Sequence, residues 1–274
     1  MADNRTLTRR IVTSALLVTL AALVTFYFPN WVFTLLGSAM IGVALLEFFS
    51  MIEKKNIFVY KIFGMIIGML VPIIIYFQMG NEGYFTLEPF FIVIACLFTF
   101  VLQFTRKDPS QAVTSIAVTL FGLLYIAWFF SFFIKIKFLP SGTLFVAFLI
   151  SVTKMSDVGA YLVGSYFGKH NLISRISPRK TVEGTAGGLI LSIVTAVASK
   201  LYLPSFGIWH LAALGLLLGL LAQVGDLAES LLKRDCGVKD SGSNLSGFGG
   251  MLDLMDSLLF TTPIFYCYLK VLMR

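Results

Sequence analysis

Long apolar stretches alternate with short polar segments along almost the whole chain. Many of these stretches hold about 20 apolar residues, the length of a helix that crosses the hydrocarbon core of a bilayer. They predict membrane-spanning helices at residues 11–28, 31–50, 57–78, 88–104, 112–133, 143–167, 185–203, 207–232 and 251–272. The pattern therefore indicates an all-α, polytopic integral membrane protein with about nine transmembrane helices.

The composition supports membrane insertion, and the distribution of the positive charge gives the orientation in the membrane. Of the 274 residues, 58% are hydrophobic and only 13% are charged, which is more apolar surface than a soluble core can bury. The net charge of +7 does not indicate nucleic-acid binding, because most Lys and Arg residues fall on alternate loops. Basic residues collect on cytoplasmic loops. We therefore expect the N-terminus in the cytoplasm, and the more basic loops, with any site that they form, facing the cytoplasm from the inner membrane.

The two halves of the chain differ in where their polar residues lie. Residues 1–142 carry charge mostly in short loops, and this half is interpreted as a transmembrane scaffold. Its exceptions, Glu47 and Lys61, are expected to extend their charged ends to the membrane interface. Residues 143–274 place polar side chains inside apolar stretches and are interpreted as the catalytic region. No linker separates the halves, so one continuous membrane domain is predicted.

Polar atoms lie well inside the sixth apolar stretch. Lys154 and Asp157 are one helical turn apart and share a face. They could form an internal ion pair or line a water-filled cavity. The neighbouring Ser156 and Tyr161 favour the cavity, because polar groups within the membrane are commonly functional.

The loop after this stretch is strongly basic. Its five cationic or titratable side chains would suit binding of phosphates. They would equally suit a loop that is attracted to anionic lipid headgroups. Ser177 followed by Pro178 resembles the N-cap and first residue of a helix, whose free amides would add an anion site. The basic or titratable side chains are Lys169, His170, Arg175, Arg179 and Lys180.

Two acidic pairs flank a glycine-rich loop between the last two apolar stretches. Asp226 and Glu229 end one stretch, and Asp253 and Asp256 open the next, each pair at i, i+3 spacing. Carboxylate oxygens together with substrate phosphates are the ligands that Mg²⁺ prefers. Asp253 taken singly could equally cap the following helix. The glycines allow close backbone approach to a ligand; they are Gly242, Gly247, Gly249 and Gly250.

These residues together resemble the signature of the phosphatidate cytidylyltransferase (CDP-diacylglycerol synthase) family. The resemblance covers roughly residues 150–265. One block of matching residues is Asp226, Glu229, Ser230, Lys233, Arg234, Lys239, Asp240, Gly242, Leu245, Gly249, Gly250, Asp253 and Asp256. The other block includes Asp157, Tyr161, Lys169, Ser177, Arg179, Lys180, Thr181 and Glu183.

The resemblance implies an enzyme that converts CTP and phosphatidic acid to CDP-diacylglycerol and pyrophosphate in phospholipid biosynthesis. It implies Mg²⁺ held by Asp226, Asp253 and Asp256, with a second cation such as K⁺ nearby, and Lys233 as a further catalytic residue. It suggests a homodimer. Substrate binding is assigned to Asp157, Tyr161, Lys169, Ser177, Arg179, Lys180, Thr181, Glu183, Glu229, Ser230, Arg234, Lys239, Asp240, Gly249 and Gly250.

Two departures from the family pattern bear on activity. Phe248 and Leu254 stand where the family usually has His and Arg, so a titratable group and a cation are missing. Alternatives therefore stay open: a catalytically impaired homologue, a lipid kinase or an archaeol-type cytidylyltransferase, and an ion-coupled transporter with charges inside broken helices. The internal repeat expected of such a transporter is absent from the sequence.

Overall fold

A computed structural model of the chain describes residues 19–80, 88–242 and 249–273. Helices cover the predicted spans from residue 31 onward, so the nearly all-α prediction is confirmed. The first predicted span begins before residue 19, and it lies partly outside the described residues, as Phe248 does entirely. Among the described residues, the exception to the helical architecture is one short β-hairpin, which the sequence pattern does not predict.

The chain packs as two compact units, one made of residues 1–138 with 236–254 and the other of residues 139–235 with 255–274. The predicted change from scaffold to catalytic region at residue 142 stays a prediction. The stretch 236–254 packs with the first unit. The helices of the first unit are α2 (Asn30–Glu53), α3 (Lys61–Gly80), α4 (Glu88–Phe104), α5 (Ala112–Gly122), the π-helical turn η1 (Leu123–Trp128) and α6 (Phe129–Lys137).

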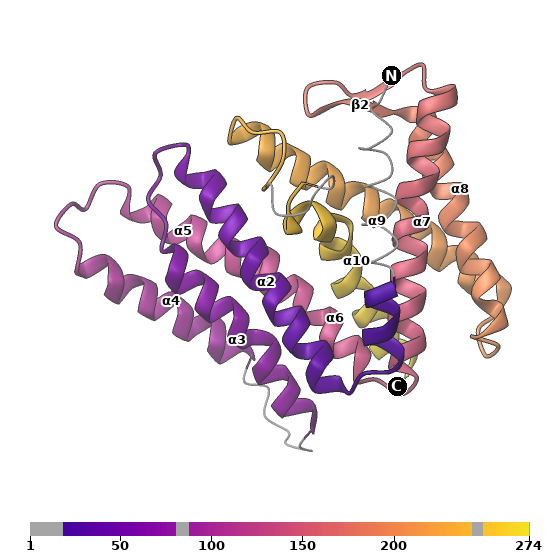
Figure 1. The fold of residues 1–274 in the computed structure, drawn as a ribbon, viewed down its shortest axis with the longest axis horizontal. Coiled ribbons are helices and arrows are strands. Elements are labelled where there is room, and N and C mark those ends of the chain that lie inside the picture. Colours follow the sequence, from indigo (N-terminus) through magenta and orange to yellow (C-terminus); the bar gives the residue numbers. More distant parts are fainter. Residues whose placement is uncertain (1–18, 81–87, 243–248, 274) are drawn as a thin grey trace. The chain divides into compact units, whose positions relative to one another are not determined.

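The first unit is held together by large apolar side chains. Helices α2 and α3 lie side by side (Figure 1), and α5, η1 and α6 pack onto them. Phe48, Phe49 and Phe130 are fully buried, together with the aliphatic side chains of Ile41 and Leu45. Such burial is the main favourable contribution to packing between the helices of this unit.

The second unit contains most of the residues that the sequence predicts to form the site. Its elements are α7 (Gly142–Phe167), β1 (Asn171–Ile173), β2 (Ser177–Thr181), α8 (Val182–Ala198), the 3₁₀ turn η2 (Ser199–Leu201), α9 (Ile208–Asp235) and the part of α10 (Met251–Leu272) that follows residue 254. Strands β1 and β2 pair antiparallel.

Small residues let α7 and α8 approach closely (Figure 1). A Cβ atom added at Gly159 would lie 2.6 Å from the carbonyl oxygen of Gly187, and one added at Gly187 would lie 2.3 Å from Val163 Cγ2. Backbones in contact through small residues are typical of helix pairs in membranes. The close packing fixes the position of the polar face of α7 against α8.

Six helical segments among the described residues are long and apolar enough to cross a bilayer. A shorter apolar helix covers Phe90–Phe104. The six segments are Asn30–Glu53, Lys61–Met79, Ala112–Lys137, Gly142–Phe167, Val182–Leu201 and Ile208–Asp235.

Candidate active site

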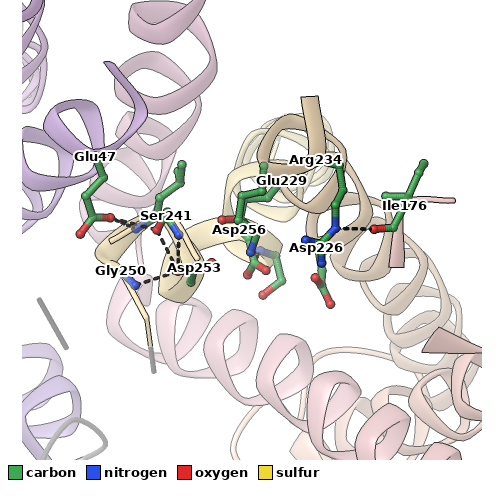
Figure 2. A network of polar contacts seen from close by, with 12 residues as sticks. Glu47, Ile176, Asp226, Glu229, Arg234, Ser241, Gly250, Asp253 and Asp256 are labelled. Carbon is green, nitrogen blue, oxygen red and sulfur yellow. Dashed lines mark hydrogen bonds and ion pairs between the residues drawn. The ribbon is translucent and has the colours of Figure 1, made fainter. Parts of the chain in front are cut away.

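Three carboxylates from α9 and α10 meet within the second unit. One oxygen from each of Asp226, Glu229 and Asp256 lies within 4.8 Å of the other two. Glu229 is fully buried and Asp256 is nearly so, whereas Asp226 is half-buried (Figure 2). Like charges this close are unfavourable unless cations lie among them, which makes the cluster a candidate metal site.

Local geometry explains why these side chains meet. Asp226 and Glu229 are one turn apart on α9, as their i, i+3 spacing predicts. At Gly225, an added Cβ would lie 2.5 Å from the carbonyl oxygen of Asp256. The absence of a side chain at Gly225 therefore lets α9 and α10 touch beside the acidic residues.

Two lysines partly neutralise this acidic cluster. Lys180 Nζ lies 2.7 Å from Asp226 Oδ2, and Lys233 Nζ lies 2.5 Å from Glu229 Oε2. The Lys233 side chain is only 12% exposed, so this is a mostly buried ion pair within one helix. Removing one partner of such a pair costs more than an exposed pair contributes.

The polar residues inside α7 form a network with α10. Lys154 Nζ lies 3.2 Å from Asp157 Oδ2 and donates to Ser257 Oγ at 3.1 Å. Ser257 Oγ in turn donates to Asp157 Oδ2 at 3.2 Å. The internal ion pair and the cavity, which the sequence left as alternatives, therefore occur together, because Asp157 also lines a cavity.

That cavity has a volume of about 480 Å³ and lies between α7, β2, α8 and α9. Gln223 from α9 also lines it and donates to the carbonyl oxygen of Thr185 at 3.0 Å. The cavity brings together acidic, basic and hydroxyl groups that are distant in the sequence. Of the predicted substrate-binding residues, those that line it are Asp157, Tyr161, Arg179, Lys180 and Thr181, with Asp226 from the acidic pairs.

The basic loop is folded differently from its prediction. Ser177 and Pro178 lie in β2, not at a helix start, so their assignment as N-cap and first helical residue is wrong. Helix α8 begins four residues later, where Thr181 Oγ1 accepts from the amide of Gly184 at 3.1 Å. Pro178 fits an edge strand, where its missing N–H has no partner to lose.

Glu183 anchors the loop to α8. Its Oε2 accepts from the amides of Lys169 at 3.1 Å and His170 at 3.2 Å, and its Oε1 lies 2.6 Å from His170 Nδ1. Arg234 Nε donates to the carbonyl oxygen of Ile176 at 3.2 Å, which ties α9 to the same loop (Figure 2). In this structure these side chains contact the protein backbone, and Lys169 itself is exposed.

Most of the other signature residues lie in the first unit, whereas Ser230 lies on α9 in the second. Asp253 Oδ2 accepts a hydrogen bond from the amide of Gly250 at 2.7 Å. It also accepts from the amide of Ser241 at 3.1 Å and from the Ser241 hydroxyl at 2.8 Å. Asp253 therefore caps the start of α10, and its assignment as a metal ligand stays a prediction. Lys239 and Asp240 are exposed, Ser230 is half-buried, and Gly249 has a left-handed φ of +88°.

The expectation for Glu47 is wrong. Its side chain is 5% exposed and binds the start of α10 instead of extending to the interface. Lys61, by contrast, pairs with Glu53 at 3.2 Å on a partly exposed surface. The sequence signal that could have identified Glu47 is a carboxylate in the interior of an apolar helix. Gln223 was also missed, and it has no comparable signal in the sequence.

Clustered carboxylates beside a basic, polar cavity, in a chain whose helices are long and apolar enough to cross a bilayer, suit a membrane enzyme that acts on phosphate-bearing substrates. The family model described as the cytidylyltransferase family matches residues 8–272. The chain therefore belongs to the cytidylyltransferase family.

Curated relatives agree with this family. The phosphatidate cytidylyltransferase of Bacillus subtilis is 33% identical over 247 residues, 87% of this chain and 89% of the relative. The phosphatidate cytidylyltransferase of Synechocystis is 29% identical over 295 residues, covering 97% of each chain. The protein of that name in Staphylococcus aureus strain COL is 38% identical over 167 residues, 60% of this chain and 63% of the relative.

Proposed function

We propose that this protein is a Mg²⁺-dependent phosphatidate cytidylyltransferase that makes CDP-diacylglycerol and pyrophosphate from CTP and phosphatidic acid. The observation that carries the proposal is the acidic cluster of Asp226, Glu229 and Asp256, next to a cavity lined by Arg179 and Lys180. The names of the relatives supply the substrates.

The residues of the cluster fit a magnesium ion. All three offer carboxylate oxygens, and one from each lies close enough to the others to share a small cation. The proposed ligands are Asp226 and Asp256, with Glu229 as a third carboxylate and Asp253 retained from the family resemblance. When bound, the ion supplies positive charge that stabilises the phosphate oxygens during transfer. A second cation such as K⁺ would share this role.

The residues of the cavity hold the two phosphate groups for reaction. An oxygen of the phosphatidate phosphate attacks the α-phosphorus of CTP, a new P–O bond forms, and the bond to the pyrophosphate leaving group breaks. The nucleophile is already an anion, so no strong general base is needed, and orientation with charge stabilisation dominates. Arg179 and Lys180 offset phosphate charge, and Tyr161 with Thr181 lines the same wall.

The membrane arrangement belongs to the same proposal. Nine crossings with a cytoplasmic N-terminus place the basic loop and the acidic cluster at the inner leaflet of the cytoplasmic membrane. There CTP arrives from the cytoplasm and phosphatidic acid from the lipid. The homodimer that the resemblance suggests is tested by the mass of the purified protein in detergent.

The decisive experiment uses purified protein with radiolabelled CTP, phosphatidic acid and Mg²⁺. The Bacillus subtilis relative is assayed alongside as the positive control. We expect a radiolabelled lipid that comigrates with CDP-diacylglycerol, and its loss in the folded Asp256→Asn variant. No product from the wild-type protein, while the relative is active, would refute the proposal. Full activity in the variant would remove Asp256 from the site.

A further inference from the structure

Glu47 is a buried carboxylate that the proposed reaction does not use. It lies within α2, in the first unit, and only 5% of it is exposed. A carboxylate is costly to bury unless strong hydrogen-bond donors surround it. Its donors therefore indicate why a charged residue stands in an otherwise apolar helix.

Three donors to Glu47 come from the segment around the start of α10. Oε1 accepts from the amide of Met251 at 3.0 Å, and Oε2 accepts from the amide of Leu252 at 2.9 Å. Ser241 Oγ also donates to Oε2 at 3.2 Å (Figure 2). The first amides of a helix have no partner within the helix. Glu47 thus caps α10 from a residue about 200 positions earlier in the chain.

Ser241 links Glu47 to Asp253. Its hydroxyl lies within hydrogen-bond distance of both carboxylates, 3.2 Å from Glu47 Oε2 and 2.8 Å from Asp253 Oδ2. A hydroxyl has a single proton, so the two carboxylates share one donor. A change in the charge or position of Glu47 is therefore transmitted to Asp253 through Ser241.

The same contacts account for two glycines of the signature. A Cβ added at Gly250 would lie 2.1 Å from Ser241 Oγ and 2.3 Å from Glu47 Oε2. One added at Gly242 would lie 2.6 Å from Glu47 Oε1. The sequence suggested that these glycines let the backbone approach a ligand. In the structure a carboxylate of the protein itself approaches both glycines, and the approach of a ligand stays a prediction.

We propose that Glu47 is a positioning residue for the transfer reaction: it fixes the start of α10 and, through Ser241, the orientation of Asp253. This inference rests on the proposed function, because positioning matters only if the acids of α10 serve catalysis. It assigns a site role to the half of the chain that the sequence presents as scaffold.

Three full-length variants test this role. Glu47→Gln keeps the size of the side chain but replaces one acceptor oxygen by a donor, while Glu47→Asp keeps both acceptors on a shorter stem. We expect kcat to fall about 10- to 100-fold in Glu47→Gln, the loss typical of groups that orient site residues. Activity should be higher in Glu47→Asp. A purely space-filling role predicts the opposite order. Glu53→Gln, on the same helix, is the matched control and should be unchanged.

Hydrogen exchange supplies a readout that does not need turnover. In Glu47→Gln, the amides of Met251 and Leu252 should exchange at least about tenfold faster. Ser241→Ala should lower kcat in the same direction and should not add fully to Glu47→Gln. The magnesium concentration for half-maximal rate should rise in both variants, with little change in the KM for phosphatidate.

Each outcome decides the proposal. The proposal is overturned if Glu47→Gln leaves either kcat or the exchange of the Met251 and Leu252 amides unchanged. It is also overturned if Glu47→Gln is more active than Glu47→Asp. If the wild-type protein makes no CDP-lipid, it is the proposed function that fails. The role of Glu47 is then decided by measuring Tm as Mg²⁺ is added without substrate. If Mg²⁺ raises the Tm of Glu47→Gln as much as that of the wild type, the role is overturned. Loss of this increase in Glu47→Gln supports the role.

Discussion

Replacing Asp256 by Asn should stabilise the metal-free protein while abolishing its activity. Two unit charges 4.8 Å apart repel by about 3.5 kcal/mol at an effective dielectric constant of 20. Asp256 meets two such charges, on Asp226 and Glu229. Lys180 and Lys233 offset part of this repulsion through their ion pairs with Asp226 and Glu229, and the charge of Lys154 attracts Asp256 itself. We therefore expect a gain of only about 1–2 kcal/mol in the free energy of unfolding.

The assay is thermal unfolding in detergent at pH 8, followed by intrinsic fluorescence, with EDTA or with Mg²⁺. For a chain of this size, 1 kcal/mol corresponds to a change in Tm of about 2–4 °C. Asp256→Asn should therefore melt about 2–8 °C above the wild type in EDTA. A ligand at 100 times its Kd adds about 2.7 kcal/mol to the native state. Mg²⁺ should add this stabilisation to the wild type but not to the variant. The wild type should therefore have the higher Tm in Mg²⁺ and the lower Tm in EDTA.

This reversal separates a metal site from a structural cluster. Exposed Glu53→Gln is the control and should move Tm little in either condition, since exposed ion pairs contribute about 0–1 kcal/mol. A variant that melts below the wild type in EDTA would contradict the repulsion argument. Equal Mg²⁺ shifts in the wild type and in Asp256→Asn would contradict the assignment of Asp256 as a ligand.

Three further changes test other parts of the second unit. Lys180→Met should raise the KM for CTP about 10- to 100-fold in steady-state assays with fold retained, because it removes a charged hydrogen-bond donor from the cavity; an unchanged KM would exclude substrate contact. Gly159→Ala should lower the free energy of unfolding by about 1–3 kcal/mol by forcing α7 away from Gly187, and a Tm equal to that of the wild type would contradict the close packing. Glu183→Ala should speed trypsin cleavage after Arg175, since the loop loses its anchor to α8; unchanged cleavage would show that the anchor is dispensable.

The sequence predicted the helices well because their signal is local. A helix in a membrane needs about 20 apolar residues, and that length is visible without knowing the neighbours. The i, i+3 pair of Asp226 and Glu229 is equally local, and the structure places both carboxylates in one cluster. Asp256 is grouped with Asp226 in one metal site only through the family resemblance, because their contact depends on the close packing of α9 and α10 at Gly225, which is not a local signal.

The errors come from competition between local signals. Ser177 and Pro178 have the residue types of an N-cap and a first helical residue, but the helix does not start there. The structure uses Thr181, because residues 177–181 pair with β1 instead. The start of α8 therefore depends on the pairing of β2 with β1. Strand β1 has only three residues, too few to show an alternating pattern in the sequence. The prediction for Glu47 was wrong for a related reason, because its hydrogen-bond donors lie about 200 residues further along the chain.

The contacts of Glu47 also change what the signature glycines signify. A glycine that approaches a ligand should tolerate substitution for folding and fail only in binding. Gly242 and Gly250 instead face Glu47, so alanine at either position should disturb the start of α10 before any substrate arrives. Part of the signature is therefore a requirement for packing a charged residue within the first unit. Loss of stability in Gly242→Ala or Gly250→Ala without substrate would therefore separate this packing requirement from a role in binding CTP or lipid.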